Sequence, residues 1–293
     1  MTQSQATSSP DVVGVFDTAT NTISYLVSDP ATGAAALIDP VLDYDPASAR
    51  TSTASVERLL EMVRERGLTL ERVLETHAHA DHLSGAHEIK ERTGAPVGIG
   101  RNITAVQKTF GPLFDATDVS PDGLVFDTLY ADGDRFRIGS LDVEVLHTPG
   151  HTPACISYRI GDAVFVGDTL FMPDYGTARC DFPGGDARTL YRSIQRLLAL
   201  PDETRIFVGH DYLPAGRTNY AWETTVAAQK ASNIHVGGGR SEDDYVTMRE
   251  ARDATLKAPH LILPSLQVNI RAGALPPPEA SGQRFLRLPL NAI

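Results

Sequence analysis

Three histidines and one aspartate stand close together in the stretch Thr76-His77-Ala78-His79-Ala80-Asp81-His82. The residues before it, 71–76, are predicted as a short buried strand. In an extended backbone, residues i and i+2 point to the same face, so His77 and His79 project together. We expect a turn at Ala80 and Asp81 to return Asp81 and His82 to the same space. Imidazole and carboxylate groups together suit zinc, iron or manganese, so the stretch predicts a metal site.

Three more segments place polar residues directly after predicted strands. They are His151 in Thr-Pro-Gly-His-Thr-Pro, Asp168 in Val-Gly-Asp-Thr-Leu, and His210 with Asp211 in Val-Gly-His-Asp-Tyr. A glycine before each of them lets the backbone approach closely, and loops at strand ends commonly carry functional residues. We expect these residues to share one site with the first motif. His147 precedes Pro149 and is interpreted as a neighbour, not a ligand.

Composition limits the function classes. The 293 residues are 42% hydrophobic, enough for one large domain or two small ones. The net charge of −11 argues against nucleic acid or an anionic membrane surface as the main partner, because phosphate binding needs a basic stripe. No apolar stretch reaches 18 residues, so no membrane span is expected.

The cysteines and the N-terminal residues indicate the cellular compartment of the protein. Cys155 and Cys180 are too few for a disulfide scaffold and are predicted to be reduced, buried thiols. Residues 1–10 are polar without a basic or apolar run, so they are predicted as a disordered tail and not a signal or transit peptide. We therefore expect a cytoplasmic protein.

Strand-like and helix-like segments alternate in two similar halves, on either side of about Ala131. Strands are predicted over 12–16, 23–27, 35–38, 71–76, 96–99, 136–138, 141–146, 155–160, 163–166 and 205–208. Helices are predicted over 53–66, 83–93, 102–108, 187–200, 220–234 and 242–257. The segment 111–127 and the glycines 237–239 are expected to be loops, and the last thirty residues are rich in proline. This order predicts two β-sheets packed face to face with helices on both outer faces.

The ligand pattern resembles the metallo-β-lactamase fold superfamily, an α+β fold built as an αββα sandwich with a metal site at one edge of its two sheets. Further stretches resemble one branch, the persulfide dioxygenases, also called sulfur dioxygenases or ETHE1-like proteins. These are Ile38-Asp39-Pro40-Val41, Thr-His-Ala-His-Ala-Asp-His-Leu-Ser-Gly, Pro-Gly-His-Thr-Pro, Arg179-Cys180-Asp181-Phe182, Gly184-Gly185-Asp186, Leu190-Tyr191, Leu200-Pro201 and Gly209-His210-Asp211-Tyr212.

The resemblance covers about residues 11–234, and the tail with Leu-Pro-Ser-Leu-Gln-Val-Asn-Ile-Arg-Ala-Gly looks like that of the longer bacterial form. It implies a single domain over 11–293, with a C-terminal extension from about residue 236. One departure lies beside the site: Cys180 stands where the family often has threonine.

The resemblance implies one Fe(II) per chain, held by His77, His151 and Asp168. Three protein ligands leave three positions for water, O₂ and substrate. The expected reaction converts glutathione persulfide, O₂ and water into glutathione and sulfite. The remaining polar residues of the motifs are then expected to orient the ligands or to form a second metal site: His79, Asp81, His82 and His210.

Two alternatives remain. In hydrolases of the superfamily the same positions bind zinc, often two ions, so a thioester hydrolase resembling glyoxalase II and acting on S-acylglutathione is also compatible. That hydrolase motif typically carries a bulky aromatic residue where this chain has Ala80. A non-enzymatic sulfur or metal sensor would need a DNA-binding or partner domain, and the sequence shows no basic segment or spare domain for it.

Glutathione carries two carboxylates, for which arginine is the expected partner because its fork pairs bidentately. Arg179 and Arg217 are predicted for this role, with Tyr175 and Tyr212 as hydroxyl donors. The alternative for Arg179 is a structural ion pair with Asp181 or Asp186. A homodimer is compatible with the sequence.

Overall fold

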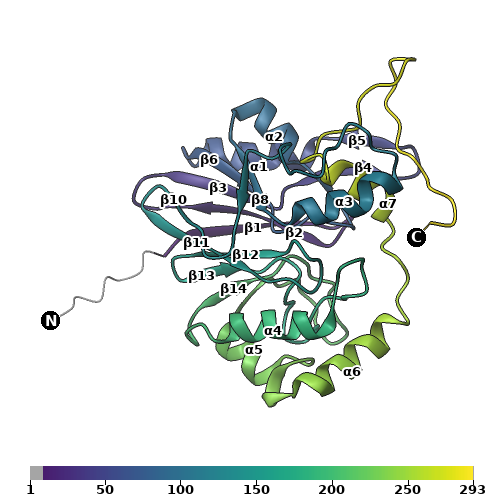
Figure 1. Cartoon of the computed structure of the whole chain (residues 1–293). Helices are drawn as coiled ribbons and strands as arrows, with labels where there is room; N and C mark the ends of the chain where they lie inside the picture. Colours follow the sequence, from purple (N-terminus) through teal and green to yellow (C-terminus); the bar gives the residue numbers. More distant parts are fainter. Residues whose placement is uncertain (1–8, 293) are drawn as a thin grey trace.

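A computed structural model describes residues 9–292, and its strands form two large stacked sheets (Figure 1). The first sheet has the order β1-β2-β3-β6-β8-β9 and the second the order β10-β11-β12-β13-β14-β15. The chain passes from one to the other between Tyr130 and Arg135, as predicted from the two similar halves. The inner faces of the sheets bury a shared apolar cluster that includes Tyr25, Ile38, Val145 and Phe165.

The strands of the first sheet are β1 (Asp11–Asp17), β2 (Thr22–Ser28), β3 (Ala34–Ile38), β6 (Thr69–Leu74), β8 (Val97–Gly100) and β9 (Thr128–Tyr130). Those of the second are β10 (Arg135–Ile138), β11 (Leu141–His147), β12 (Ile156–Ile160), β13 (Ala163–Phe165), β14 (Arg205–Phe207) and β15 (Glu223–Thr225). A small third sheet joins β5 (Arg50–Ser52), β4 (Val41–Asp45) and β7 (Leu83–Ser84).

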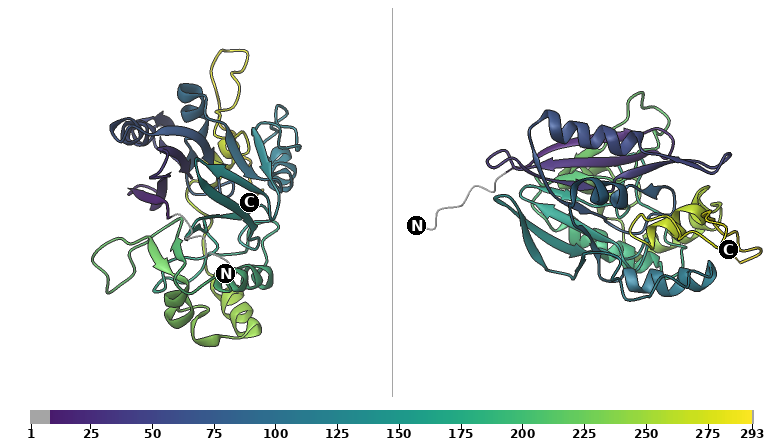
Figure 2. Two further views of the ribbon diagram at one scale, coloured as in Figure 1. Left: turned by 90° about the vertical axis from the view of Figure 1, so that its left-hand side faces the viewer. Right: turned by 90° about the horizontal axis from the view of Figure 1, so that it is seen from above.

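Helices cover both outer faces, which confirms the predicted αββα sandwich (Figures 1 and 2). On the first sheet lie α1 (Ala54–Glu65), α2 (Ala86–Thr93), α3 (Ile103–Leu113) and α7 (Ile262–Asn269), which share an apolar cluster with its strands. On the second lie α4 (Ala187–Leu198), α5 (Val226–Ser232) and α6 (Glu242–Asp253), and the short 3₁₀ turn η1 (Gly237–Gly239) connects the last two. Among the described residues, no helix combines the length and apolar character that crossing a bilayer requires.

Three regions differ most from the prediction. The helix predicted over 83–93 begins only at Ala86, because Leu83 and Ser84 pair with Leu42 and Val41 as a short strand. The helix predicted over 220–234 is a strand, β15, followed by the helix α5, since the threonines at 224 and 225 pair with β14. The proline-rich C-terminal region contains an unpredicted helix, α7.

The predicted N-terminal tail lies mostly outside the described residues, which begin at Ser9. Ser9 and Pro10 are bonded to the second sheet: the Ser9 hydroxyl donates to Asp162, and Arg205 donates to the Pro10 carbonyl at 3.1 Å. The single-domain boundary over 11–293 stays a prediction.

The strand order brings the ends of strands from both halves to one edge. β6 runs parallel to β3 and β8, and β13 runs parallel to β14. A loop that carries polar residues follows each of β6, β13 and β14. Backbone bonds join the halves there: the Ile156 amide donates to the Thr76 carbonyl at 3.0 Å, and the Ile23 amide donates to the Gly209 carbonyl at 2.9 Å. All predicted metal-binding residues except His151 follow these strand ends, and His151 lies in the loop after β11.

Candidate metal centre

His77, His151 and Asp168 form a buried triad whose ligand atoms lie within 4.8 Å of one another. Asp168 Oδ2 is 3.6 Å from His151 Nε2 and 3.9 Å from His77 Nε2. His151 Nδ1 donates to the Arg179 carbonyl at 2.7 Å, so Nε2 keeps its lone pair. His77 Nδ1 lies 3.0 Å from the Thr76 hydroxyl, which donates to Asp39 at 2.8 Å. Both rings are thus fixed by their outer nitrogens, as metal-binding histidines usually are.

A second cluster of His79, Asp81 and His210 adjoins the triad. His210 Nε2 is 3.1 Å from Asp81 Oδ2 and 3.3 Å from Asp168 Oδ1. Its Nδ1 lies 3.2 Å from the Asn21 carbonyl, which accepts its proton. Asp168 therefore faces the triad with one oxygen and the second cluster with the other. The predicted residues are brought together in a geometry compatible with one metal ion or two.

His82 completes the group. Its Nδ1 donates to the Leu83 carbonyl at 3.1 Å, and its ring centroid is 4.1 Å from that of His79. Burial lowers the pKa of His82 to about 3, and burial likewise lowers the pKa of His77 well below its ordinary value. Both rings are therefore neutral and carry the lone pair that a metal needs.

Two buried acids that the motif analysis did not single out as site residues, Asp39 and Glu75, lie behind the second histidine of the motif. His79 Nε2 is 3.1 Å from Asp39 Oδ1 and 3.5 Å from Glu75 Oε2. Burial opposes protonation of His79, but the two acids reverse this and raise its pKa well above the ordinary value. Asp39 had a local signal, an aspartate before proline at a strand end, where it adopts a φ of 48°. Glu75 had none.

Buried atoms without partners test whether the site fits a metal. His77 Nε2, His82 Nε2, His79 Nδ1 and Asp168 Oδ1 are buried and have no hydrogen-bond partner among the described residues. Leaving several buried nitrogen and oxygen atoms unpaired is strongly unfavourable unless another group satisfies them. Imidazole and carboxylate donors suit iron and zinc alike, so the residues fit a metal cofactor.

A large cavity of about 1190 Å³ opens onto the triad. His151, Asp168 and Asp81 lie at its wall, together with Ala80, whose methyl group leaves space beside the metal-binding residues. The aromatic side of the cavity includes Phe171, Tyr175, Tyr212 and Phe182, and the rings of Tyr175 and Tyr212 stack at 4.8 Å. Both tyrosines predicted for substrate binding thus line the cavity.

The arginines predicted for substrate binding are already paired. Arg179 lines the cavity, but its Nε and Nη2 donate to Asp181 at 2.6 Å each and its Nη1 donates to the Lys257 carbonyl at 2.6 Å. The ion pair that the sequence left open as an alternative is therefore present. Arg217 donates to Asp211 and lies 2.9 Å from Asp174, and it is not among the residues lining the cavity.

Three other arginines line the same cavity, and one of them, the buried Arg249, is paired with Asp253. Arg50 on β5 and Arg252 on α6 are exposed, and within residues 9–292 neither has a carboxylate partner. Sequence reasoning missed them because they are distant from every motif. Their positive charges are available to an anionic ligand.

The sequence and the fold match known proteins. The sequence profile described as "Metallo-beta-lactamase superfamily" matches residues 17–210. A protein of Burkholderia pseudomallei named "Probable metallo-hydrolase" is 54% identical, over 96% of this chain and 99% of its own length. The human mitochondrial "Persulfide dioxygenase ETHE1" is 30% identical, over 68% of this chain and 67% of its own length.

A solved structure extends the comparison to three dimensions. The crystal structure of ETHE1 from Myxococcus xanthus aligns with a TM-score of 0.72 and 35% identity, covering 90% of this chain and 100% of that one. The profile spans well over half of the chain and includes every predicted metal-binding residue. The chain therefore belongs to the metallo-beta-lactamase superfamily.

Proposed function

We propose that this protein is an iron-dependent persulfide dioxygenase that oxidises glutathione persulfide with O₂ and water to glutathione and sulfite. One Fe(II) would be held by His77, His151 and Asp168. The observation that carries the proposal is the triad of two imidazoles and one carboxylate, of which His151 and Asp168 lie at the wall of a cavity large enough for a tripeptide. The likeness to the ETHE1 structure over its whole length supports it.

Each group has a task in this reaction. A bound iron would supply adjacent positions for the persulfide sulfur and O₂. The triad residues orient those positions, because the hydrogen bonds at His151 Nδ1 and His77 Nδ1 fix both rings. His210 Nε2 and Asp81 Oδ2 lie 3.1 Å apart beside the triad and can hold or pass a proton during the uptake of water. The aromatic wall encloses the peptide part of the substrate.

A zinc-dependent thioester hydrolase of the glyoxalase II type is the second candidate. The position of Asp168 between the two clusters favours it, because a shared carboxylate is what two adjacent metal ions need. The name of the Burkholderia relative also points to hydrolysis. Metal identity and number separate the two candidates.

The first prediction is that protein purified without chelators contains about one iron per chain and little zinc. Elemental analysis of the purified chain measures both, and an oxygen electrode measures O₂ uptake on glutathione persulfide. The same preparation is assayed against S-lactoylglutathione as a control. Two zinc ions per chain, with thioester hydrolysis and no O₂ uptake, would establish the hydrolase in place of the dioxygenase.

The second prediction concerns substrate carboxylates. Arg252→Gln is expected to raise KM for glutathione persulfide roughly tenfold with kcat little changed, because an unpaired guanidinium in the cavity can form charge-assisted bonds to a carboxylate. Arg179→Gln should change KM less, since Asp181 and the Lys257 carbonyl already occupy that guanidinium.

The matched control is Arg58→Gln, which removes an exposed arginine on α1 outside the cavity and should leave KM unchanged. A larger KM increase for Arg179→Gln than for Arg252→Gln would contradict this prediction. It would show that Arg179 binds the substrate carboxylate, as the sequence predicts. Steady-state O₂ consumption over a range of persulfide concentrations provides all of these values.

A further inference from the structure

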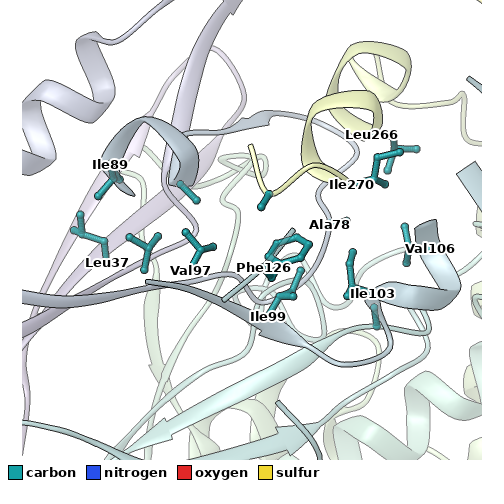
Figure 3. Packing of buried hydrophobic residues seen from close by; sticks show 14 of the residues in the cluster. Leu37, Ala78, Ile89, Val97, Ile99, Ile103, Val106, Phe126, Leu266 and Ile270 are labelled. Atoms are coloured by element: carbon teal, nitrogen blue, oxygen red, sulfur yellow. The ribbon is translucent and has the colours of Figure 1, made fainter. Parts of the chain in front are cut away.

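The C-terminal segment packs directly against the loop that carries the metal motif. Leu266 on α7 and Ile270 just after it belong to the same buried cluster as Ala78, the residue between His77 and His79. Figure 3 shows Leu266 and Ile270 facing this part of the core, with Ala78 below them. The segment therefore packs against the residue between the first two histidines of the motif.

Asn269, the last residue of α7, bonds to this loop through every polar atom of its side chain. Its Nδ2 donates to the His79 carbonyl and to the His82 carbonyl, both at 2.8 Å. Its Oδ1 accepts from the Ser84 amide at 2.8 Å. The residue is 3% exposed, so these bonds are shielded from water. One amide thus bonds to three backbone positions between His79 and Ser84, the stretch that leads into β7.

The contact continues to the metal-facing rings. The Ser84 hydroxyl donates to Glu75 Oε1, while Glu75 Oε2 lies 3.5 Å from His79 Nε2. The loop between β6 and β7 belongs to neither strand, and the backbone bonds to Asp39 and Ile156 hold it at Thr76, before the histidines. The orientation of His79 and His82 therefore depends on bonds that come from nearly 190 residues further along the chain.

The segment is itself held in place. Arg271 pairs with Asp118 through two bonds of 2.7 and 2.6 Å, and Gln107 donates to the Ile270 carbonyl at 3.0 Å. Gly273 has a φ of 88°, and a Cβ there would lie only 2.8 Å from the Ser84 carbonyl. Asn269 is thus presented on a rigid support, close against the loop.

We propose that Asn269 is a positioning residue of the metal centre: by fixing the backbone at His79, His82 and Ser84 it sets the affinity of the site for its metal. The role assigned to the C-terminal segment is to complete the metal-binding loop. It rests on the proposed function only in requiring that a metal binds at these residues, and it holds for iron or zinc.

The test is the isosteric variant Asn269→Asp in the full-length protein. The carboxylate keeps the bond from the Ser84 amide, but it cannot donate and it repels the carbonyls of His79 and His82. We expect dissociation constants about ten- to a hundredfold higher for Zn(II), and for Fe(II) under anaerobic conditions, measured by competition with a chelator. Because the two metals are titrated separately, failure of the iron assignment is distinguishable from failure of the positioning role.

Gln267→Glu is the matched control. Gln267 is a buried amide on the same helix, and its bonds go to Leu263 and Arg287, not to the metal-binding loop. It should lower the melting temperature of the metal-free protein while leaving both metal affinities unchanged. Wild-type affinity in N269D, or equal loss of affinity in the two variants, would overturn the proposal.

The wild-type protein provides an independent measurement that needs no variant to fold. In the metal-free chain, the Ser84 amide is expected to resist hydrogen exchange as strongly as the amides of β6, because Asn269 holds it without help from a metal. Rapid exchange at Ser84 in the metal-free protein would show that Asn269 does not order the loop, and the proposal would fail.

Discussion

Replacing Asp168 by alanine is expected to leave the protein almost free of metal and to reduce turnover by more than about a hundredfold. Asp168 is the only anionic member of the triad, and its two oxygens face His151 on one side and His210 on the other. Without it, two neutral imidazoles remain to hold a divalent ion. Elemental analysis after gel filtration measures the loss, and the assay for O₂ uptake measures its consequence.

Asp29→Asn is the control for general destabilisation. Asp29 is a buried acid between β2 and β3 that accepts bonds from the Ser140 amide and hydroxyl at 2.7 Å, at the opposite edge of the sandwich. This variant should unfold at a lower temperature yet keep its metal. Full metal content in Asp168→Ala would contradict the assignment of the triad.

His210→Ala is expected to keep iron and to slow turnover by about ten- to a hundredfold. In the mononuclear arrangement His210 touches Asp168 Oδ1 but is not itself a ligand, so it orients the carboxylate. In a two-metal hydrolase the same ring would bind the second ion. The variant therefore separates the two candidate functions by a measurement that is independent of substrate.

The measurement is the metal content of wild type and variant, set beside kcat for O₂ uptake. Unchanged iron with reduced kcat supports the dioxygenase. A wild type with two ions, of which the variant loses one, contradicts the mononuclear assignment. His147→Ala provides the matched control, since the ring of this histidine lies 3.1 Å from Asn102 Nδ2 and 3.1 Å from the Pro153 carbonyl and does not line the cavity.

The clustering of the predicted metal ligands could be foreseen from sequence because each of them lies a few residues after the end of a strand. In this fold the strands ending at Leu74, His147, Phe165 and Phe207 are followed by loops that meet at one edge, so polar residues just past strand ends are expected to lie together. The two sheets and most helices followed from periodicity for the same reason. The number of bound metal ions depends on the distances between the ligand atoms, and the sequence pattern does not give these distances.

The residues around the ligands were less predictable. Glu75 lies in a predicted strand and resembles any strand residue, and Asn269 lies in a tail with no helical signal, yet both contact the motif. The start of the segment 220–234 was predicted as helix because its strand partner, β14, lies about twenty residues away in sequence. Such long-range pairings override local propensity, and a single sequence does not display them.

The hydrogen bonds from Asn269 to the metal-binding loop have a consequence for the order in which the protein folds and binds metal. The residues that face the metal extend from His77 to His210, and the side chain that fixes their loop comes 59 residues after the last of them. Contacts that span so much sequence form late, since the intervening chain must first be ordered. On a ribosome, the loop acquires its final shape only after nearly the whole chain has emerged. The role proposed for Asn269 thus places tight metal capture at the end of synthesis, so that half-made chains would not hold a metal ion in an unfinished pocket.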